Sequence, residues 1–273
     1  MIIDTNRKVT NSDIKIKSYI DEIKKVIKLI DEYGALSFGR DFVLVGRNCF
    51  SLQKIIISVE LTLSNLCVCC ENGCISDANI LMRKYRDDMF FYLFILNHSK
   101  NTMSYEKYDI EIEQKIEDWI HNKMKDLYIG DILKGIQANE KVRNLVKQYK
   151  LKDSFDEIAD YFNNYVHSNG YGYYNENLIG AKRDQLYQSY ENIVRHLKYI
   201  TTVFLVILIL LSPGLVMAYD YILSLEEGVP PLENSQYIVE RFIEVFLQAN
   251  IDFIDSSCYD FLQANTCMHL TKK

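Results

Sequence analysis

The scarcity of proline and glycine constrains the fold of this chain more than any other feature of its sequence. Only 3 prolines and 11 glycines occur in 273 residues, against roughly 12% of an average protein for the two types together. Tight turns and helix ends require these residues. Barrels, sandwiches and propellers need many tight turns, so the composition argues against them and predicts an all-α fold, a multi-helix bundle.

The positions of the prolines suggest a division of the chain. All three lie in its last quarter, at Pro213, Pro230 and Pro231, so no proline interrupts a helix before them. We therefore expect a helical bundle at 1–212 and a helical C-terminal extension at 213–273 that packs on it. The content of hydrophobic residues (48%) and of charged residues (25%) excludes a disordered chain.

Hydrophobic periodicity places the helices of the bundle. An N-cap at 11–13 followed by isoleucines at three- and four-residue spacing predicts a first helix that ends near Gly34. Three apolar helices at 50–73, 77–97 and 181–211 form the core of the expected bundle. The helix at 50–73 is apolar on nearly every side, which is typical of a buried central helix. No segment shows a persuasive strand period, and further helices are expected within 105–149, from 153 toward 167, and at 236–249.

Residues 200–219 carry no charge and are long enough to span a bilayer. Basic residues before this run and acidic residues after it would place its N-terminal side in the cytoplasm. The alternative is a core helix over 199–211 that stops at Ser-Pro-Gly and is followed by a second short buried helix. We favour the core helix, because Pro213 interrupts the run and because the preceding helix is continuous with it.

The N-terminus has no apolar stretch typical of a secretory signal, and the chain contains an odd number of cysteines, 7. Together these features predict a cytoplasmic protein with reduced thiols. Four of the cysteines, Cys67, Cys69, Cys70 and Cys74, lie within eight residues. Their spacing does not match that of structural zinc sites. Cys67, Cys70 and Cys74 would share one face of a helix, so we expect core packing and no metal site.

His167 differs from the other four histidines, for which we expect structural or surface roles. It lies between a predicted helix and a polar loop at 168–180, among asparagines, serine and tyrosines. A histidine at such a junction can transfer protons near neutral pH. The simpler interpretation is a helix-end histidine that is hydrogen-bonded to a backbone carbonyl.

Three segments together resemble the HEPN superfamily over roughly residues 50–211: the apolar helix, the arginine-bearing DANILMRKYRDD and the later FNNYVHSNG. The resemblance implies a helical bundle, and many members of the family are metal-independent RNA-cleaving toxins or defence nucleases. It also implies a homodimer, because two copies of the family motif usually meet at a dimer face. In the motif R-N-x-x-x-H, Asn163 and His167 match, but Phe162 occupies the arginine position.

The resemblance implies a role for each candidate residue. His167 would act as general acid or base, with Asn163 and Asn164 positioning it. Arg83 or Arg86 would bind the RNA phosphate in place of the missing motif arginine, whose loss would raise the barrier by about 3 kcal/mol. No cofactor is implied.

Simpler roles exist for several of these residues. Arg83 and Arg86 can pair with Asp87 or Asp88 on their own helix. Tyr171 and Tyr173 in the loop would stack on RNA bases, although tyrosine is abundant throughout this chain.

The sequence leaves three functions open. The first is a defence or toxin-type protein with RNA-cleaving activity, whose partners are RNA and a second copy of the chain. The second is a catalytically inactive binding module or partner subunit, in which Phe162 is simply a core residue. The third is an effector anchored in a membrane through 200–219. The net charge of −6 argues only against a protein that coats DNA.

Overall fold

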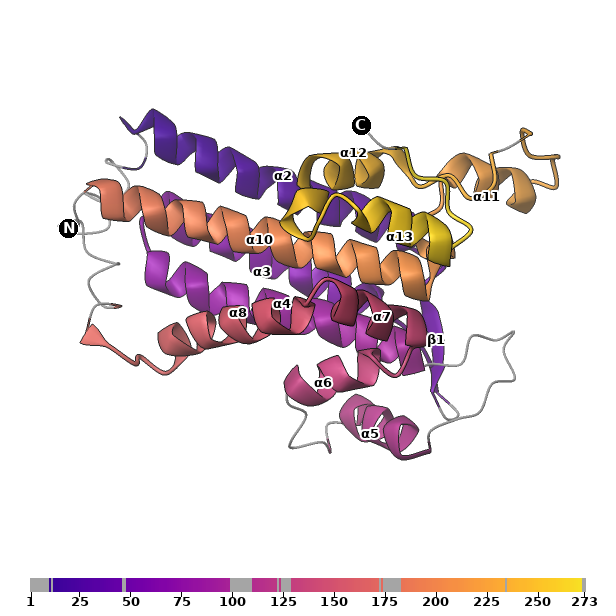
Figure 1. Ribbon diagram of the computed structural model, residues 1–273, viewed down its shortest axis with the longest axis horizontal. Helices are drawn as coiled ribbons and strands as arrows, with labels where there is room; N and C mark the ends of the chain where they lie inside the picture. Colours follow the sequence, from indigo (N-terminus) through magenta and orange to yellow (C-terminus); the bar gives the residue numbers. More distant parts are fainter. Residues whose placement is uncertain are drawn as a thin grey trace.

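The computed structural model describes residues 10, 12–45, 48–98, 110–121, 123, 129–171, 173, 183–233 and 235–271. These residues form eleven α-helices and one two-stranded β-hairpin, so the predicted all-α fold is confirmed. Five long helices run side by side and make up the body of the molecule (Figure 1). They are α2 (Ile14–Ser37), α3 (Gln53–Glu71), α4 (Ile75–His98), α8 (Leu151–Val166) and α10 (Arg183–Leu211).

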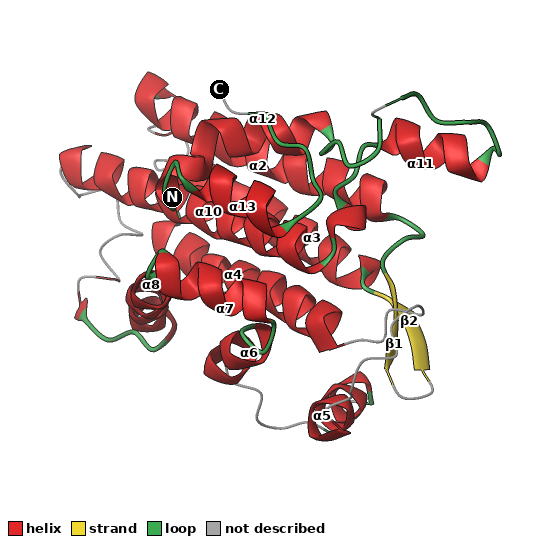
Figure 2. Ribbon diagram, turned by 45° about the vertical axis from the view of Figure 1, so that its right-hand side comes forward, coloured by secondary structure: helices red, strands yellow, loops and turns green. Residues whose placement is uncertain are grey.

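Shorter elements surround this body. On one side lie α5 (Ile110–Ile120), α6 (Ile129–Ile136) and α7 (Glu140–Gln148), and the chain ends with α11 (Tyr219–Glu226), α12 (Arg241–Asn250) and α13 (Cys258–Asn265). Figure 2 shows the hairpin of β1 (Phe42–Val45) and β2 (Asn48–Ser51) at one end of the bundle, where β1 contacts α5. The hairpin is antiparallel and was not predicted, because four-residue strands are too short to show a clear period.

The start of α2 is confirmed as predicted. The Asp13 carboxylate accepts hydrogen bonds from the backbone amides of Lys15 (2.9 Å) and Ile16 (3.2 Å), which satisfies two free donors of the first turn. The helix continues past Gly34 to Ser37. The helix predicted at 77–97 is α4, which begins two residues earlier than predicted, at Ile75.

The central helix of the bundle is α10, which contacts α2 and α4 as well as α7, α12 and α13. Every residue from Ile200 to Leu210 is buried. Phe204 packs its ring edge-to-face on Tyr33 and Tyr92, with centroids 5.9 Å and 5.7 Å away. The hydroxyl groups of Tyr85 and Thr201 lie 2.7 Å apart and join α4 to α10.

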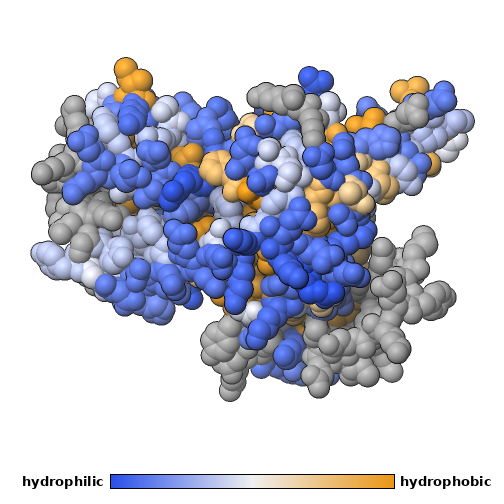
Figure 3. All heavy atoms as spheres, viewed as in Figure 1, coloured by the Kyte–Doolittle hydropathy of each residue, from blue (hydrophilic) through white to orange (hydrophobic). Residues whose placement is uncertain are grey.

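The run at 200–219 does not form one helix. α10 ends at Leu211, and a 3₁₀ turn follows at Pro213–Leu215, so the predicted stop at Ser-Pro-Gly is confirmed. The short helix expected after this stop is only the 3₁₀ turn, in which Leu215 is buried, and the next helix, α11, has no buried residue. Hydrophobic side chains are exposed on and after α11 (Figure 3), among them Leu225 and Leu232. α11 has no extensive contact with another of the described elements, so its apolar side chains stay uncovered.

The prediction that the helix at 50–73 is buried on all sides is also wrong. Within the described residues, two helices, α3 and α10, are long and apolar enough to cross a membrane. The apolar stretch of α10 is 89% buried, whereas that of α3 is only 39% buried. The main contacts of α3 are with α2 and α4. These contacts leave a third face of the helix open, where Ile57, Leu61 and Val68 are about half exposed.

The segment after Pro213 returns to the bundle through α12 and α13, both of which contact α10. Two isolated β-bridges hold it, Met217 with Val239 and Ile238 with His269. α12 begins at Arg241, five residues after the predicted start at Gln236, and it also contacts α2. The first long helix of the chain and one of its last helices are therefore neighbours.

Candidate functional site

His167 is the C-cap residue of α8, and its side chain is exposed. Its backbone amide donates to the carbonyl of Asn163 at 2.9 Å, and the amide of Asn169 donates to the carbonyl of Asn164 at 2.9 Å. The two predicted positioning asparagines thus hold the end of the helix through their backbones. The predicted junction between helix and loop is confirmed, while 172 and 174–180 of the loop lie outside the described residues.

The two loop tyrosines differ in their surroundings. Tyr171 is 82% exposed, so its ring is open to a stacking partner. The ring of Tyr173 packs edge-to-face on Tyr165 of α8, with centroids 4.6 Å apart. The ring of Tyr173 therefore helps to hold the loop against α8.

Arg83 and Arg86 contact Asp87 on their own helix, as the simpler interpretation predicted. Arg86 donates to one carboxylate oxygen of Asp87 through Nε at 2.8 Å and Nη2 at 2.6 Å, and the Nε of Arg83 lies 3.7 Å from the other. Arg86 is buried, and its Nη1 has no hydrogen-bond partner among the described residues. No hydrogen bond or ion pair within the described part of the chain joins either guanidinium to His167.

Phe162 occupies the position of the motif arginine and is fully buried. Its ring packs on the ring of His196 from α10, with centroids 5.4 Å apart. An arginine here would place its charge inside the interface between α8 and α10, where burying an unpaired charge is costly. At the position of the motif arginine, the structure therefore has a buried phenylalanine and no guanidinium that could act with His167.

His196 lies in an ordinary amphipathic segment of the sequence, yet it is the only buried histidine among the described residues. Its ring lies between Tyr161 (centroids 4.8 Å apart) and Phe162, and its Nδ1 has no hydrogen-bond partner. Burial, with a smaller contribution from the charge of Arg195, lowers the pKa of His196 to about 4. His196 is thus a neutral core histidine, a role that only the packing of α8 on α10 reveals.

A half-open cavity of about 620 Å³ lies between α2, α10 and α12, and we call it the α2–α12 groove. One wall is a face of α12 formed by Phe242, Val245, Phe246 and Ala249. The other side of α12 is buried in the bundle through Ile243 and Leu247. On α2, Val26 and Leu29 complete the apolar lining.

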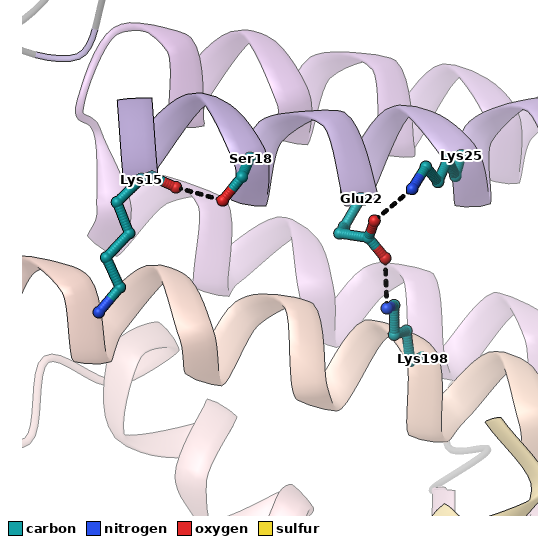
Figure 4. Close-up of polar contacts among 5 residues, drawn as sticks. All are labelled: Lys15, Ser18, Glu22, Lys25 and Lys198. Atoms are coloured by element: carbon teal, nitrogen blue, oxygen red, sulfur yellow. Dashed lines mark hydrogen bonds and ion pairs between the residues drawn. The ribbon is translucent and has the colours of Figure 1, made fainter. Parts of the chain in front are cut away.

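Charged side chains surround this apolar lining. Figure 4 shows the carboxylate of Glu22 between two lysines, Lys25 of α2 at 2.5 Å and Lys198 of α10. Burial raises the pKa of Glu22, but the hydrogen bonds from Lys198 and Lys25 outweigh this effect and hold the pKa below its usual value. Farther along α2, Lys28 lies 3.6 Å from Glu32.

The charges at the start of α12 have other partners. Glu240 caps the helix: its two carboxylate oxygens accept hydrogen bonds from the backbone amides of Tyr219 (3.0 Å) and Arg241 (3.1 Å). Arg241 is exposed, and no carboxylate in the described residues pairs with its guanidinium. Among the described residues that line the groove, Arg241 is therefore the cation without an ion-pair partner.

Sequence reasoning missed this groove, although α12 carries a signal for it. Phe242, Val245, Phe246 and Ala249 follow the spacing of one helix face, next to a second apolar face through Ile243 and Leu247. Two apolar faces on one short helix indicate a second contact surface. The opposite wall, α2, comes from the other end of the chain, and no local pattern predicts that pairing.

Two of the four clustered cysteines are buried core residues. Cys67 and Cys70 are buried in α3, and burial raises the pKa of the Cys67 thiol to about 11. Cys74 lies beyond the end of α3, so the predicted shared face stops at Cys70. Among the described residues, no three His, Cys, Asp or Glu side chains come together as a metal site would require.

The described geometry thus contains two candidate sites, the exposed His167 at the end of α8 and the α2–α12 groove. Comparison with protein-family models, curated proteins and solved structures finds no match to this chain. A functional assignment must therefore rest on the chemistry of these two sites.

Proposed function

We propose that this is a helical ligand-binding protein whose binding site is the α2–α12 groove. The observation that carries the proposal is the cavity itself, about 620 Å³ in volume and lined by apolar side chains with charged groups around them. Binding pockets for small molecules measure roughly 300–1,000 Å³ and combine an apolar lining with a few polar groups that fix orientation. The function is that of the binding module, the second of the three possibilities left open by the sequence.

The exposure of the groove wall supports this function. Val245 is 55% exposed, on a helix whose other apolar face is buried. Covering apolar surface releases about 25 cal/mol per Å². A ligand in the groove would therefore gain free energy from a surface that the rest of the chain leaves uncovered.

The test is a titration with the fluorescent amphiphile 1-anilinonaphthalene-8-sulfonate. We expect saturable binding to the folded wild-type protein and loss of binding in Val245→Glu, which places a charge in the apolar wall. The matched control is Ile57→Glu, which changes a similarly exposed apolar residue on α3, outside the groove. Circular dichroism checks that both variants are folded. Equal binding by all three proteins, or no binding by the wild type, would overturn the proposal.

A second candidate function is metal-independent RNA cleavage by a homodimer, and the observation that favours it is the exposure of His167. In this hypothesis His167 transfers the proton while Asn163 and Asn164 hold it in place. The engagement of Arg83 and Arg86 with Asp87 weakens the hypothesis, because the phosphate then lacks a partner.

Expression of wild type and His167→Ala in bacteria, followed by analysis of cellular RNA, tests this second function. RNA cleavage that disappears in the variant would support it. Intact RNA in both strains, or equal cleavage in both, would exclude a catalytic role for His167.

A further inference from the structure

We propose that the α2–α12 groove takes an amphipathic monoanion: a carboxylate on a long apolar body, the chemistry of a fatty acid. This inference rests on the proposed binding function and adds the class of ligand. It follows from the charges around the groove, the partners that these charges already have, and the apolar wall of α12.

Among the described residues that line the groove, the cations outnumber the carboxylates by one. Its lining includes the four basic residues Lys25, Lys28, Lys198 and Arg241 and the three acidic residues Glu22, Glu32 and Glu240. A ligand with one negative charge would balance the site. A dianion such as a phosphate monoester would leave excess negative charge, and a neutral amphiphile would leave the excess positive charge uncompensated.

The partners of these groups locate the excess positive charge. Glu22 is shared by Lys25 and Lys198, and Glu32 pairs with Lys28. Glu240 uses its two oxygens on backbone amides at the start of α12. Arg241 therefore remains as the cation to which a ligand can bind, with Lys198 close enough to the groove to contribute.

The position of Arg241 does not serve the stability of its own helix. Arg241 is the first residue of α12, where the positive end of the helix dipole disfavours a cation. Glu240 already caps this terminus, so a ligand carboxylate bound here would be stabilised by the guanidinium of Arg241. The planar guanidinium also binds a carboxylate through two parallel hydrogen bonds, an arrangement that a lysine ammonium does not provide.

The apolar body of the ligand has a matching surface directly beside this cation. Phe242, Val245, Phe246 and Ala249 continue along α12 from Arg241, and the last of these lies two turns farther on. Val26 and Leu29 face them from α2. An extended alkyl chain whose head is at Arg241 would lie along this wall and exclude water from it.

Three probes with the same alkyl chain test the inference in calorimetric titrations: dodecanoate and dodecylammonium below their micellar concentrations, and dodecanol below its solubility limit. We expect dodecanoate to bind about tenfold more tightly than dodecanol, because a charge-assisted hydrogen bond has an effect of this size. Dodecylammonium should bind most weakly. Arg241→Gln should weaken dodecanoate about tenfold and leave dodecanol unchanged.

Lys17→Gln is the matched control, since it removes an exposed cation from α2 outside the groove. It should bind all three probes like the wild type. If dodecanol binds as tightly as dodecanoate, or if Lys17→Gln weakens dodecanoate as much as Arg241→Gln does, the assignment of an anionic ligand is wrong and the groove remains a binding site. If none of the probes binds, the binding function fails together with the ligand class.

Discussion

The helices α3 and α10 both contain a long apolar stretch, more apolar in α10, but they occupy opposite environments. Both are long and apolar enough to cross a membrane, yet the apolar stretch of α10 is 89% buried and that of α3 only 39% buried. α10 has helices around it on several sides, whereas α3 packs mainly on α2 and α4. The burial of an apolar helix therefore depends on how many neighbours the fold supplies, and its composition does not reveal that number.

The first prediction concerns Phe204, a fully buried aromatic residue of α10. Phe204→Ala should lower the free energy of unfolding by about 3–5 kcal/mol, because it leaves a cavity between Tyr33 and Tyr92. Urea denaturation monitored by circular dichroism measures the loss. A loss below about 1 kcal/mol would mean that α10 is not the centre of the core.

The second prediction uses the neutral histidine of α10. The pKa of His196 is about 4 in the folded protein and about 6.5 in an unfolded chain, so the unfolded state binds more protons between these values. The stability that His196 contributes is therefore complete above pH 6.5 and decreases as the pH falls toward 4. We expect a loss of about 2 kcal/mol between pH 7 and pH 5.

Replacing the histidine isolates this effect. His196→Phe should remove the dependence over that pH range, while His167→Ala, at an exposed histidine, should retain it. Denaturation at the two pH values in each variant gives the comparison. An equal dependence in wild type and His196→Phe would show that another group is responsible.

The third prediction concerns a polar contact within the apolar region. Tyr85→Phe removes the hydroxyl group that lies 2.7 Å from Thr201 Oγ1 and should cost about 1 kcal/mol in unfolding free energy. The hydroxyl of Thr201 retains its bond to the carbonyl of Leu197, which limits the loss. Thermal denaturation can resolve a change of this size, and an unchanged melting temperature would argue against the contact.

The smallest effect is expected on α3. Leu61 is 58% exposed, so Leu61→Ala should change the free energy of unfolding by no more than about 0.5 kcal/mol. A loss comparable to that of Phe204→Ala would show that the open face of α3 is covered in solution. The two helices would then no longer differ in how completely their apolar side chains are covered.

The features that were predicted from the sequence depend on local signals. The cap at Asp13 and the end of α10 before Pro213 each follow from a few adjacent residues. The pairing of Arg83 and Arg86 with Asp87 was also foreseeable, since the residues share one helix. The all-α class follows from the few glycines and prolines.

The features that were missed depend on contacts between distant segments. Ile57 and Val68 lie on the open face of α3, on which no third helix packs among the described residues, and no helical period encodes this. The low pKa of His196 requires α8 to pack on α10. The α2–α12 groove requires residues from both ends of the chain, and for this reason the sequence pointed to His167 and not to Arg241.

The origin of the two groove walls has a consequence for the timing of folding. Proteins are synthesised from the N-terminus, so α2 emerges from the ribosome about two hundred residues before α12. The groove can therefore form only after α12 has been synthesised. A molecule that binds the native state alone also stabilises it, so a ligand of the groove would stabilise chains that contain both helices and leave those that stop before α12 unprotected from proteolysis.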